Sequence, residues 1–540
     1  MQGIEKLVDA VALILENSEP PTEDALFCIT KAQATVVSMT SGMDFFESDI
    51  AQAVKTLQTR FIHRMPMGAL FESEDYRPWL AGRQGDIDWY YWRRYRKHLM
   101  VNKGFSPHVV RTLDETTDKI IDRLEDPKKE GGWARRGMVV GHVQSGKTAN
   151  YTGLVCKAAD AGYQVIIVLA GLLNSLRNQT QERLDSDFMG WCTRMNDFVG
   201  ASRFGKEKPR PVCFTTSVED FKKRTANTIA MGLDAINVPI LFVLKKNKST
   251  LNNLYRWLSD HNKHNLREFS MLMIDDEADH ASVNTNKEDC DPTAINQSIR
   301  DILSLFNRSS FVGYTATPFA NIFIDPENED EMQNGEIYKD LFPRDFILSL
   351  DPPDNYIGPH RLFAEEADIN SIRTIDDNED LLPAKHKIDF VPPSLPISLK
   401  QAINCFIIGK AIRLLRGHKG KHHSMMINAS RFTNVQNILK GLVSEYVKSI
   451  RQAINNYGGL KSETALSNKE LQSLHNTWES EFSDKVDQWE KLQPNLKPSI
   501  DTIEVISINS KSDDVLDYSS DQYPNGRSLI AIGGLVQCKI

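Results

Sequence analysis

The stretch Gly137-Met-Val-Val-Gly-His-Val-Gln-Ser-Gly-Lys-Thr148 decides the fold of the first half of this chain. Its last eight residues fit G-x-x-x-x-G-K-T, the pattern of a phosphate-binding loop. Gly141 and Gly146 let the backbone turn so that successive N–H groups point at phosphate oxygens. Lys147 supplies a cation for the terminal phosphates, and the hydroxyl of Thr148 suits Mg²⁺. The stretch therefore predicts a nucleotide-phosphate site between a strand and a helix.

The sequence context favours this loop over a surface loop that carries an unrelated lysine. The apolar run before it is typical of a buried strand, and residues 148–161 have the pattern of a helix, whose N-terminus favours an anion. We expect ATP and Mg²⁺ as the ligands. The residues expected to hold them are Gly141, Gln144, Ser145, Gly146, Lys147 and Thr148.

Short apolar runs alternate with helical stretches from about residue 135 to residue 325, which predicts an α/β fold with a parallel sheet. Several of these runs are apolar throughout, as expected for strands that helices cover on both faces. The candidate strands are Met138–Val140, Val165–Leu169, Val212–Thr215, Ile240–Leu244, Met271–Ile274 and Phe311–Tyr314.

A cluster of acidic side chains follows the candidate strand Met271–Ile274. The carboxyl ends of parallel strands face the ligand crevice, so a carboxylate there is placed to hold the Mg²⁺ of a bound nucleotide. We assign Asp276 to the metal and Glu277 to the attacking water, with Asp275 as the alternative if the register shifts by one. Alone, the cluster would also fit a strand end with an acidic cap. Its place after a phosphate-binding loop favours the catalytic interpretation.

The third motif, Gly313-Tyr-Thr-Ala-Thr-Pro318, again follows an apolar strand. Its Thr-Ala-Thr resembles the segment that links the nucleotide site to the nucleic-acid cleft in superfamily 2 helicases. We expect Thr315 and Thr317 to couple the two sites, and a simple Thr/Pro turn is the alternative. The three motifs, in this order and spacing, resemble the first motor lobe of those helicases.

Composition divides the chain into four parts. Residues 1–130 have the pattern of a helical region, and residues 131–325 that of a RecA-like lobe. Residues 326–394 are acidic and rich in Pro, Asn and Asp, which indicates a solvated connector or insertion. The α/β alternation resumes over residues 395–540, where we expect an incomplete second RecA-like lobe.

One segment of the helical region, Asp86–Met100, mixes aromatic with basic side chains. Such a mixture could stack bases and hold phosphates. Helical spacing explains it equally well as an amphipathic helix with a buried aromatic face and a solvated basic face, and we prefer this interpretation.

Longer blocks of sequence extend the likeness to helicases. These blocks are GMVVGHVQSGKTANYTGLVCKAAD (137–160), VLAGLLNSLRNQTQERL (168–184), FVLKKN (242–247), YTATPFAN (314–321) and SMMINASRFTNVQ (424–436). They resemble the Z-1 domain family, helicase-like bacterial proteins that are named as endonucleases and associated with restriction and phage-defence loci. The resemblance covers residues 89–534. It implies an ATP-dependent motor acting on nucleic acid, with DNA expected, and a partner ATPase or nuclease of a defence system.

The same resemblance implies that the segment after the second strand contacts a nucleic-acid backbone. Hydroxyl, amide and guanidinium groups position a phosphate backbone without reading its sequence. The candidates are Asn174, Arg177, Gln179 and Thr180, followed by Lys245, Lys246, Ser430 and Arg431. The alternative for the first four is an ordinary polar helix face.

The chain departs from the family after Gly533-Gly534. Family members continue into a Ser-Arg-Gly loop and a segment whose arginines contact the γ-phosphate, whereas this sequence stops at Ile540. Such an arginine contributes ~10³–10⁵ in rate in related enzymes. We therefore expect a truncated form that folds its first lobe and binds ATP, with impaired hydrolysis and translocation.

The residues themselves do not predict a nuclease site. Glu336-Ile-Tyr-Lys339 has part of the spacing of a restriction-type Mg²⁺ site but lacks a partner Asp on a strand. Endonuclease activity is therefore implied by the family alone. Two alternatives remain: a Mg²⁺-dependent endonuclease with another site, and an ATP-gated scaffold for a partner nuclease or ATPase.

Charge and cysteine content restrict the class of protein. The net charge of -8 gives no overall positive field for nucleic acid, so any binding must use local basic surfaces. The cysteines are scattered with no C-x-x-C pair, which favours a reducing cytoplasm over a zinc ribbon or disulfide framework. No run reaches the ~18 apolar residues of a membrane span, and residues 1–16 lack the basic start of a signal peptide. We expect a cytoplasmic protein without membrane contact.

Overall fold

The computed structural model divides the chain into two compact units, Met1–Ile369 (unit 1) and Asn370–Ile540 (unit 2). The structure describes residues 2–15, 23–61, 69–74, 76–141, 146–222, 233–262, 266–284, 293–351, 361–362, 372–418, 420–509, 518, 523 and 525–533. None of the described helices combines the length and the apolar character that crossing a membrane requires.

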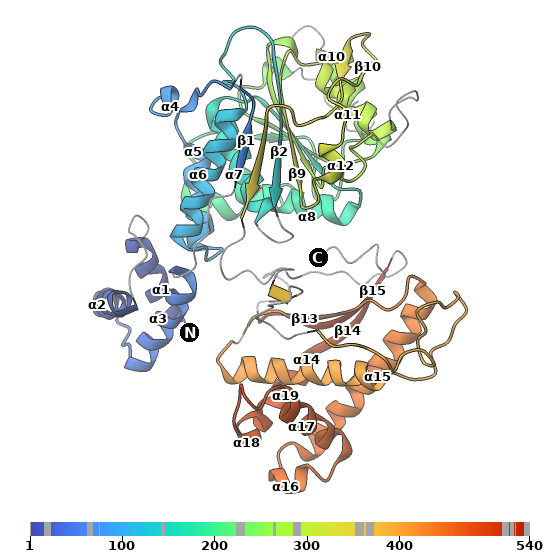
Figure 1. The fold of residues 1–540 in the computed structure, drawn as a ribbon. Helices are drawn as coiled ribbons and strands as arrows, with labels where there is room; N and C mark the ends of the chain where they lie inside the picture. Colours follow the sequence, from blue (N-terminus) through green and yellow to red (C-terminus); the bar gives the residue numbers. More distant parts are fainter. Residues whose placement is uncertain are drawn as a thin grey trace. The chain divides into compact units, whose positions relative to one another are not determined.

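Unit 1 is α/β and centres on an eight-stranded sheet (Figure 1). The strand order is β1-β12-β2-β9-β8-β3-β7-β6, and neighbours are parallel except β1 with β12 at the edge. The strands are β1 Leu70–Glu72, β2 Trp133–Gly141, β3 Val165–Ala170, β6 Val212–Cys213, β7 Ile240–Leu244, β8 Ser270–Asp276, β9 Arg308–Thr315 and β12 Phe346–Leu350. The predicted parallel sheet is confirmed, and every predicted strand contributes to it, although β6 is shorter than expected.

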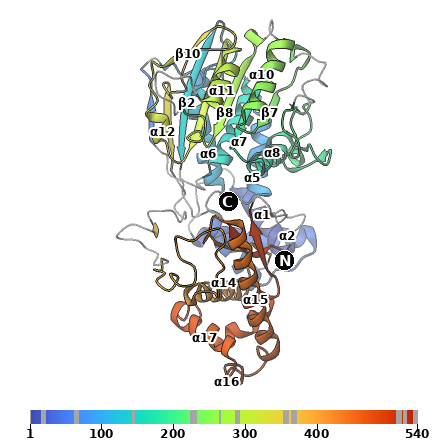
Figure 2. The same ribbon diagram turned by 90° about the vertical axis from the view of Figure 1, so that its right-hand side faces the viewer.

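Helices cover both faces of this sheet. Figure 1 shows α5, α6 and α7 on one face and α10 and α11 on the other, and Figure 2 shows α10 and α11 in front of the strands. The helices are α4 Leu80–Arg83, α5 Tyr90–Val101, α6 Pro107–Arg123, α7 Lys147–Ala161, α8 Asn174–Leu184, α10 Lys248–Asn262, α11 Ala294–Ser304 and α12 Phe319–Ile322. Ile166 of β3 belongs to the core beneath α7, and its neighbour Ile167 belongs to the core beneath α10. Burial on both faces explains why these strands are apolar throughout.

The helix that follows the phosphate-binding loop, α7, is fixed on nearly all sides. Its residues from Asn150 onward are almost all buried between the sheet and the layer of α5 and α6. Lys157, 1% exposed, forms ion pairs with Asp114 and Asp118 of α6, the second at 2.6 Å. Because a buried ammonium needs such partners, these ion pairs hold α7 to α6. Lys147, the first residue of α7, is therefore carried by a rigid element.

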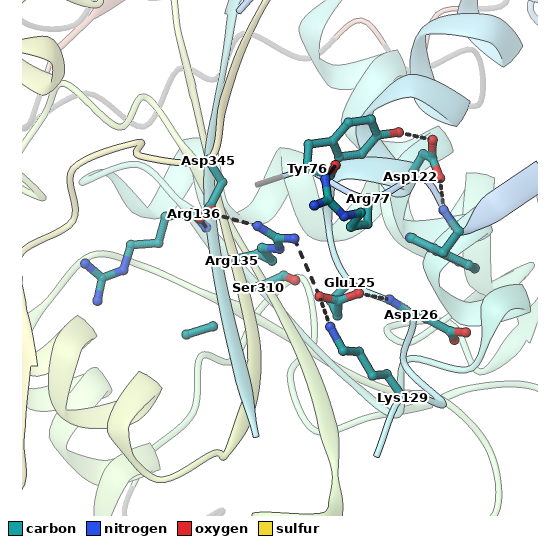
Figure 3. Close-up of polar contacts among 12 residues, drawn as sticks. Tyr76, Arg77, Asp122, Glu125, Asp126, Lys129, Arg135, Arg136, Ser310 and Asp345 are labelled. Atoms are coloured by element: carbon teal, nitrogen blue, oxygen red, sulfur yellow. Dashed lines mark hydrogen bonds and ion pairs between the residues drawn. The ribbon is translucent and has the colours of Figure 1, made fainter. Parts of the chain in front are cut away.

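The segment predicted as an acidic connector, residues 326–394, contributes the strand β12 to the sheet. Asp345, just before β12, accepts a hydrogen bond from the side chain of Arg135 at 2.9 Å and one from the N–H of Arg136 at 2.6 Å. Figure 3 shows Arg135 between Asp345 and Glu125, whose carboxylate lies 3.6 Å from its guanidinium. These contacts tie the start of β12 to the start of β2 and to the end of α6.

A close approach between β2 and β12 explains one glycine of the opening motif. The ring of Phe346 lies against Gly137, and a Cβ at this position would overlap the ring. Gly137 is therefore required by packing across the pair of strands, in addition to any role in the loop that follows.

The acidic run before β12 is anchored and differs from the solvated linker that its composition suggested. Strands β10 (Glu329–Glu331) and β11 (Ile337–Lys339) form an antiparallel hairpin. Asp330 forms an ion pair with Arg300 of α11, which is fully buried and also donates to the carbonyl of Tyr338. The buried guanidinium needs a carboxylate and a carbonyl to offset its desolvation, and the hairpin supplies both.

The aromatic and basic segment predicted as an amphipathic helix is α5. Its rings Tyr91, Trp92 and Tyr95 are buried and belong to the core that α5 shares with α7. Arg93 and Lys97 are exposed. The buried aromatic face agrees with the amphipathic interpretation, whereas Tyr90 and Arg94 have surroundings of a different kind, which are described below.

Three N-terminal helices, α1 (Gln2–Ile14), α2 (Glu23–Ser41) and α3 (Glu47–Phe61), share a separate small core. This core includes Leu7, Leu26 and Leu57, each 0% exposed. The helical character expected for the start of the chain is present, with the edge strand β1 as an exception.

Unit 2 is a smaller α/β body around a parallel sheet in the order β13-β15-β14. Its elements are α14 Ile397–Leu415, β13 His423–Ile427, α15 Thr433–Tyr457, α16 Ser462–Ala465, α17 Lys469–Glu481, α18 Trp489–Leu492, α19 Leu496–Ile500, β14 Ile503–Ile508 and β15 Ser528–Gly533. The helix α15 packs on β14 and β15, α17 packs against α14 and α15, and all three helices share a core with Ile530. The α/β alternation expected from residue 395 is observed.

Candidate functional site at the carboxyl edge of the sheet

The carboxyl ends of adjacent strands in unit 1 bring the sequence motifs together. β9 lies between β2 and β8, with Val140 opposite Thr315 and Tyr314 opposite Asp276. Gly141, Thr315 and Asp276 therefore end their strands side by side. Parallel α/β sheets bind ligands at this edge, so its chemistry decides what the unit can do.

Lys147 and Gly146 form the start of α7 at this edge. Lys147 donates from Nζ to the carbonyl of Gly141 at 2.8 Å. Gly146 adopts the left-handed φ of 92°, and a Cβ placed on it would meet no atom within 4 Å. The glycine is thus required by its backbone angle, and it stands at a helix N-terminus that carries an ammonium. The predicted ligands Gln144 and Ser145 lie outside the described residues.

Thr148 faces a cation that the sequence did not single out. Its Oγ1 accepts a hydrogen bond at 3.1 Å from Nη1 of Arg183, in the last turn of α8. Arg183 thus adds a second positive charge next to the first turn of α7. Two cations and a helix N-terminus in one place suit a group with several negative charges, such as a polyphosphate.

Asp276 is the half-buried last residue of β8. Its pKa is raised to about 6, first by burial and then by the neighbouring carboxylate of Glu277, while the charges of Lys246 and Lys147 oppose the shift. The effect of Lys147 on this pKa means that the two charges are within electrostatic reach on the same edge. A carboxylate with a raised pKa is one that a bound cation would stabilise in its ionised form.

Asp275 and Lys246 form a fully buried ion pair beneath the acidic loop. Their charged atoms lie 2.6 Å apart and both side chains are 0% exposed. Lys246 also donates to the carbonyls of Glu277 at 2.7 Å and of His280 at 3.1 Å. Asp275 is therefore committed to Lys246, and Lys246 is removed from any nucleic-acid surface. The neighbouring Lys245 donates from Nζ to the side chain of Asn174 at 2.8 Å.

Glu277 has a backbone conformation that is costly for a residue with a side chain. Its φ is 55°, in the left-handed region. Its N–H donates to Oδ1 of Asp276 at 3.1 Å, and Lys246 binds its carbonyl from below. Its carboxylate lies over Gly171, where a Cβ would be 3.6 Å from Oε2, and 3.6 Å from Nδ1 of His280. Contacts on several sides thus hold a strained residue at the tip of β8.

Asp279 joins the acidic loop to the third motif. Its carboxylate accepts hydrogen bonds from the hydroxyls of Thr315 at 2.8 Å and Thr317 at 2.6 Å. Burial alone would raise the pKa of Asp279, but the two hydroxyls and the nearby His280 outweigh it and hold the pKa below its usual value. Both predicted coupling residues therefore bind one carboxylate that follows β8.

The residues predicted to contact a nucleic-acid backbone divide between the two faces of α8. Arg177, 2% exposed, donates to the carbonyl of Glu219 at 3.4 Å and to the side chain of Asn178 at 2.6 Å, and Thr180 is also buried. Asn174 and Gln179 are exposed. In this conformation, only the last two present their side chains to solvent.

The sequence analysis assigned no role to Asp279 or Arg183, and it did not predict that Lys246 is an internal cation. Asp279 belongs to the acidic cluster that follows Met271–Ile274, but it is 36 and 38 residues away from Thr315 and Thr317, so no local pattern indicated their contact. The partners of Lys246 and Arg183 come from other elements of the sheet layer. Only the three-dimensional arrangement of strand ends shows these pairs.

The remaining candidates lie outside this edge. In unit 2, Ser430 is buried, and its hydroxyl hydrogen-bonds to Nε2 of His386 at 2.8 Å. Glu336 and Lys339 form separate ion pairs, with Arg267 at 3.4 Å and with Glu327 at 2.8 Å. Among the described residues, no cluster of three or more His, Cys, Asp or Glu side chains has the arrangement of a metal site.

Comparisons with known proteins give a family match in unit 2. A Z1 domain model matches residues 398–537, which confirms for this part of the chain the resemblance that its sequence blocks suggested. No curated protein matches the chain.

Solved structures give weaker likenesses. The helicase domain of Hef from Pyrococcus furiosus is 13% identical, with 74% of this chain and 82% of that chain covered and a TM-score of 0.28. The 54 kDa protein of the signal recognition particle from Aeropyrum pernix K1, in complex with GDP, is 14% identical, with 86% and 98% covered and a TM-score of 0.16. The assignment of unit 1 as α/β therefore rests on its own strand order.

Proposed function

We propose that unit 1 is the ATP- and Mg²⁺-binding lobe of a superfamily 2 helicase-type motor that acts on nucleic acid. The observation that carries this proposal is the meeting of Lys147, Asp276 and Thr315 at the carboxyl edge of one parallel sheet. The donor set fits the ligands, because the ammonium and the N-terminus of α7 suit phosphate oxygens. A hydroxyl and a carboxylate are oxygen ligands that Mg²⁺ prefers.

Each residue has a part that follows from its position. Lys147, with Arg183 beside it, holds negative charge at the start of α7. Thr148 and Asp276 provide oxygen ligands for Mg²⁺, which supplies charge neutralisation on the phosphates when it is bound. Glu277 is the next carboxylate along the edge and is placed to orient a water molecule.

Asp279 carries the coupling in this proposal. It binds Thr315, the last residue of β9, and Thr317 just beyond it, and it belongs to the loop that begins after Asp276 with Glu277. A shift of the acidic loop would therefore pull on the Thr-Ala-Thr segment. The exposed Asn174 and Gln179 at α8, together with Lys245, are the residues that we assign to the nucleic-acid backbone.

The Z1 match in unit 2 supports a finer proposal about context. By the family resemblance, the nucleic acid is DNA, and the protein works with a partner nuclease or ATPase in a restriction or phage-defence system. Co-purification of such a partner with the tagged chain, retained after nuclease treatment, is the expected result. A chain that purifies alone under the same conditions would contradict the partner.

Substitution of Lys147 tests the ATP site directly. We expect Lys147→Ala to weaken binding of a fluorescent ATP analogue in the presence of Mg²⁺ by at least tenfold, because the ammonium at the N-terminus of α7 is lost. The matched control is Lys97→Ala, which removes an exposed lysine from α5. Both variants should retain the wild-type circular dichroism spectrum.

Equal ATP affinity in Lys147→Ala and in the wild type would overturn the assignment of this loop. Turnover is measured on the same samples with and without single-stranded and duplex DNA. Nucleic-acid stimulation of wild-type turnover that is absent in Lys147→Ala supports the motor. Robust ATP binding and turnover that no nucleic acid changes would favour an ATP-gated scaffold.

A further inference from the structure

A second concave site lies on the α5 side of unit 1, away from the sheet edge. Asp160, near the end of α7, accepts the N–H groups of Tyr91 and Trp92 at the start of α5 at 3.0 and 2.9 Å. Asp160 stands thirteen residues along α7 from Lys147, a rise of about 20 Å. A pocket beside the start of α5 is therefore separate from the phosphate-binding loop.

This pocket encloses about 320 Å³ and is lined by rings and cations. Its wall elements are α5, the turn Asp185–Met189, the hairpin of β4 (Trp191–Cys192) with β5 (Asp197–Phe198), and the chain from residue 200 to residue 210. The rings are Tyr90, Trp191 and Phe198, and the cations are Arg94, Lys206, Lys208 and Arg210. No Asp or Glu is among the residues that line it. The lining therefore favours an anion that carries a flat ring.

The floor of the pocket carries a cation without an ion-pair partner and a hydroxyl without a hydrogen-bond partner among the described residues. Arg94 is 5% exposed and donates only long hydrogen bonds, to the carbonyls of Ala201 at 3.3 Å and Met189 at 3.4 Å. None of the described carboxylates forms an ion pair with it. The hydroxyl of Tyr90, also 5% exposed, has no hydrogen-bond partner among the described residues. A buried guanidinium without a counter-charge is costly, and an anion that binds it would offset that cost.

Glycines bring the backbone close to Arg94. Gly190 has φ of 69°, and a Cβ there would overlap Nη2 of Arg94. A Cβ on Gly205 would stand 2.7 Å from Oε2 of the exposed Glu207, 3.4 Å from the ring of Tyr90 and 3.5 Å from Cδ of Arg94, and Glu207 forms no ion pair with Arg94 among the described residues. The floor is thus built around the guanidinium by backbone that no larger residue could form, unlike a group of surface lysines.

The mouth of the pocket combines aromatic faces with exposed cations. The rings of Trp191 and Phe198 meet edge to face at 4.9 Å, and Phe198 is 51% exposed. Arg210 lies 4.0 Å above Trp191, and Lys206 lies 3.9 Å above Phe198. Neither of these two cations forms an ion pair with a described carboxylate, whereas Lys208 pairs with Asp88 at 2.7 Å. A flat ring can stack at this mouth, and the cations can close over it.

We propose that this pocket binds a nucleotide unit with a terminal phosphate. The phosphate reaches the floor at Arg94 and the hydroxyl of Tyr90, and the base stacks at the mouth against Trp191 and Phe198. An internal phosphodiester carries chain on both sides, so only a terminal phosphate fits an enclosed floor. The source is either a free mononucleotide or the phosphorylated end of a nucleic-acid strand, and the two share this chemistry.

The test uses the full chain with Lys147→Ala, so that binding at the sheet edge does not contribute. Isothermal titration is performed with adenosine, 5′-AMP, inorganic phosphate, and a ten-nucleotide single strand with or without a 5′-phosphate. We expect the phosphorylated form of the mononucleotide, the strand or both to bind at least tenfold more tightly than its unphosphorylated form. Preference for 5′-AMP over adenosine identifies the free nucleotide as the source, and preference within the strands identifies the strand end.

Three further substitutions test the two halves of the site. Arg94→Gln should abolish the preference for the phosphate, and Arg210→Gln, at an exposed position, should reduce it severalfold without disturbing the fold. Phe198→Ala should weaken nucleotide binding about tenfold and leave inorganic phosphate unchanged, because the base loses an aromatic face on which to stack and free phosphate has no base. Equal affinity for phosphorylated and unphosphorylated ligands would overturn the proposal. So would a phosphate preference that survives in both arginine variants, or inorganic phosphate binding as tightly as the nucleotide.

Discussion

Replacing Lys246 with methionine tests whether a buried ion pair holds the acidic loop in place. The ammonium of Lys246 lies 2.6 Å from the Asp275 carboxylate and donates to the carbonyls of Glu277 and His280. Methionine has a similar length and no charge. It therefore removes these three interactions together and leaves Asp275 buried without its cation.

The structure sets the expected size of this effect. Removing one partner of a buried ion pair costs about 3–5 kcal/mol, and each lost hydrogen bond to a carbonyl adds roughly 1 kcal/mol. We expect Lys246→Met to lower the free energy of unfolding of unit 1 by about 5–7 kcal/mol, summing those terms. The double variant Lys246→Met/Asp275→Leu leaves no unpaired charge, so its loss should be only about 1–3 kcal/mol.

Urea unfolding followed by circular dichroism and tryptophan fluorescence measures these differences. The matched control is Lys245→Met, which removes the adjacent, half-exposed lysine and should change the free energy of unfolding by no more than about 0.5 kcal/mol. Recovery in the double variant separates the unpaired charge from lost packing, since both variants carry the same methionine.

The dependence on pH gives a second, independent readout. Burial raises the pKa of Asp275 and Lys246 opposes the shift, so removing Lys246 raises the folded-state pKa further above the unfolded value of about 3.9. The folded variant then holds a proton that the unfolded chain releases. Its stability falls as the pH rises through this window, by up to about 1.4 kcal/mol per pH unit. A loss below about 1 kcal/mol at pH 7, or a double variant no more stable than the single one, would refute the role of the ion pair.

Four other predictions concern the sheet and its edge. Gly137→Ala should lower the free energy of unfolding by about 1–3 kcal/mol in urea titrations, because its Cβ overlaps an aromatic ring on β12. The control is Gly82→Ala, where a Cβ meets no atom within 4 Å, and it should not lower the free energy of unfolding. Asp279→Asn should lower the free energy of unfolding by about 1.5–3 kcal/mol at pH 7. The pKa of the wild-type carboxyl is lowered, so its contribution to stability is present at neutral pH and is lost on acidification. The difference between variant and wild type should therefore shrink as the pH falls. Affinity for the ATP analogue should fall about tenfold in Arg183→Ala. Mg²⁺-dependent affinity should decline below pH 6 as Asp276 takes up a proton. An affinity that does not change between pH 5 and pH 7 would contradict the role of Asp276 as a metal ligand.

The sequence predicted the central strands because their environment is uniform along the chain. β3, β7 and β8 are covered on both faces, so nearly every residue is buried and a short apolar run is a sufficient signal. The edge strand β1 and its neighbour β12 were not predicted. β12 alternates buried with half-buried residues, and its place depends on Asp345 and Arg135, which are 210 residues apart in the chain. Amino-acid composition alone, which set the boundary at residue 326, cannot show that a later segment pairs with a strand so far away in the sequence.

The same contrast applies to the candidate site. Lys147, Thr148 and Asp276 could be named from sequence because their chemistry depends on a loop or strand end that is local. Lys246, which follows β7, could not be identified as an internal cation, because its partner Asp275 lies in a different strand, β8. β3 lies between β7 and β8, and the N–H of Lys246 donates to the carbonyl of Gly171 at the end of β3 at 2.9 Å.

These contacts connect the acidic loop after β8 to the ends of β7 and β9. Lys246, after β7, holds the carbonyls on one side of the loop, and Asp279, on the other side, holds the hydroxyls after β9. Glu277 stands between them in a left-handed conformation that these anchors maintain. These contacts come from strands on both sides of β8. A movement of the loop after a change of charge at Asp276 would therefore also displace the segment of Thr315 and Thr317. If unit 1 binds a nucleotide as we propose, these anchors are the route by which binding at the start of α7 would reach the segment of Thr315 and Thr317.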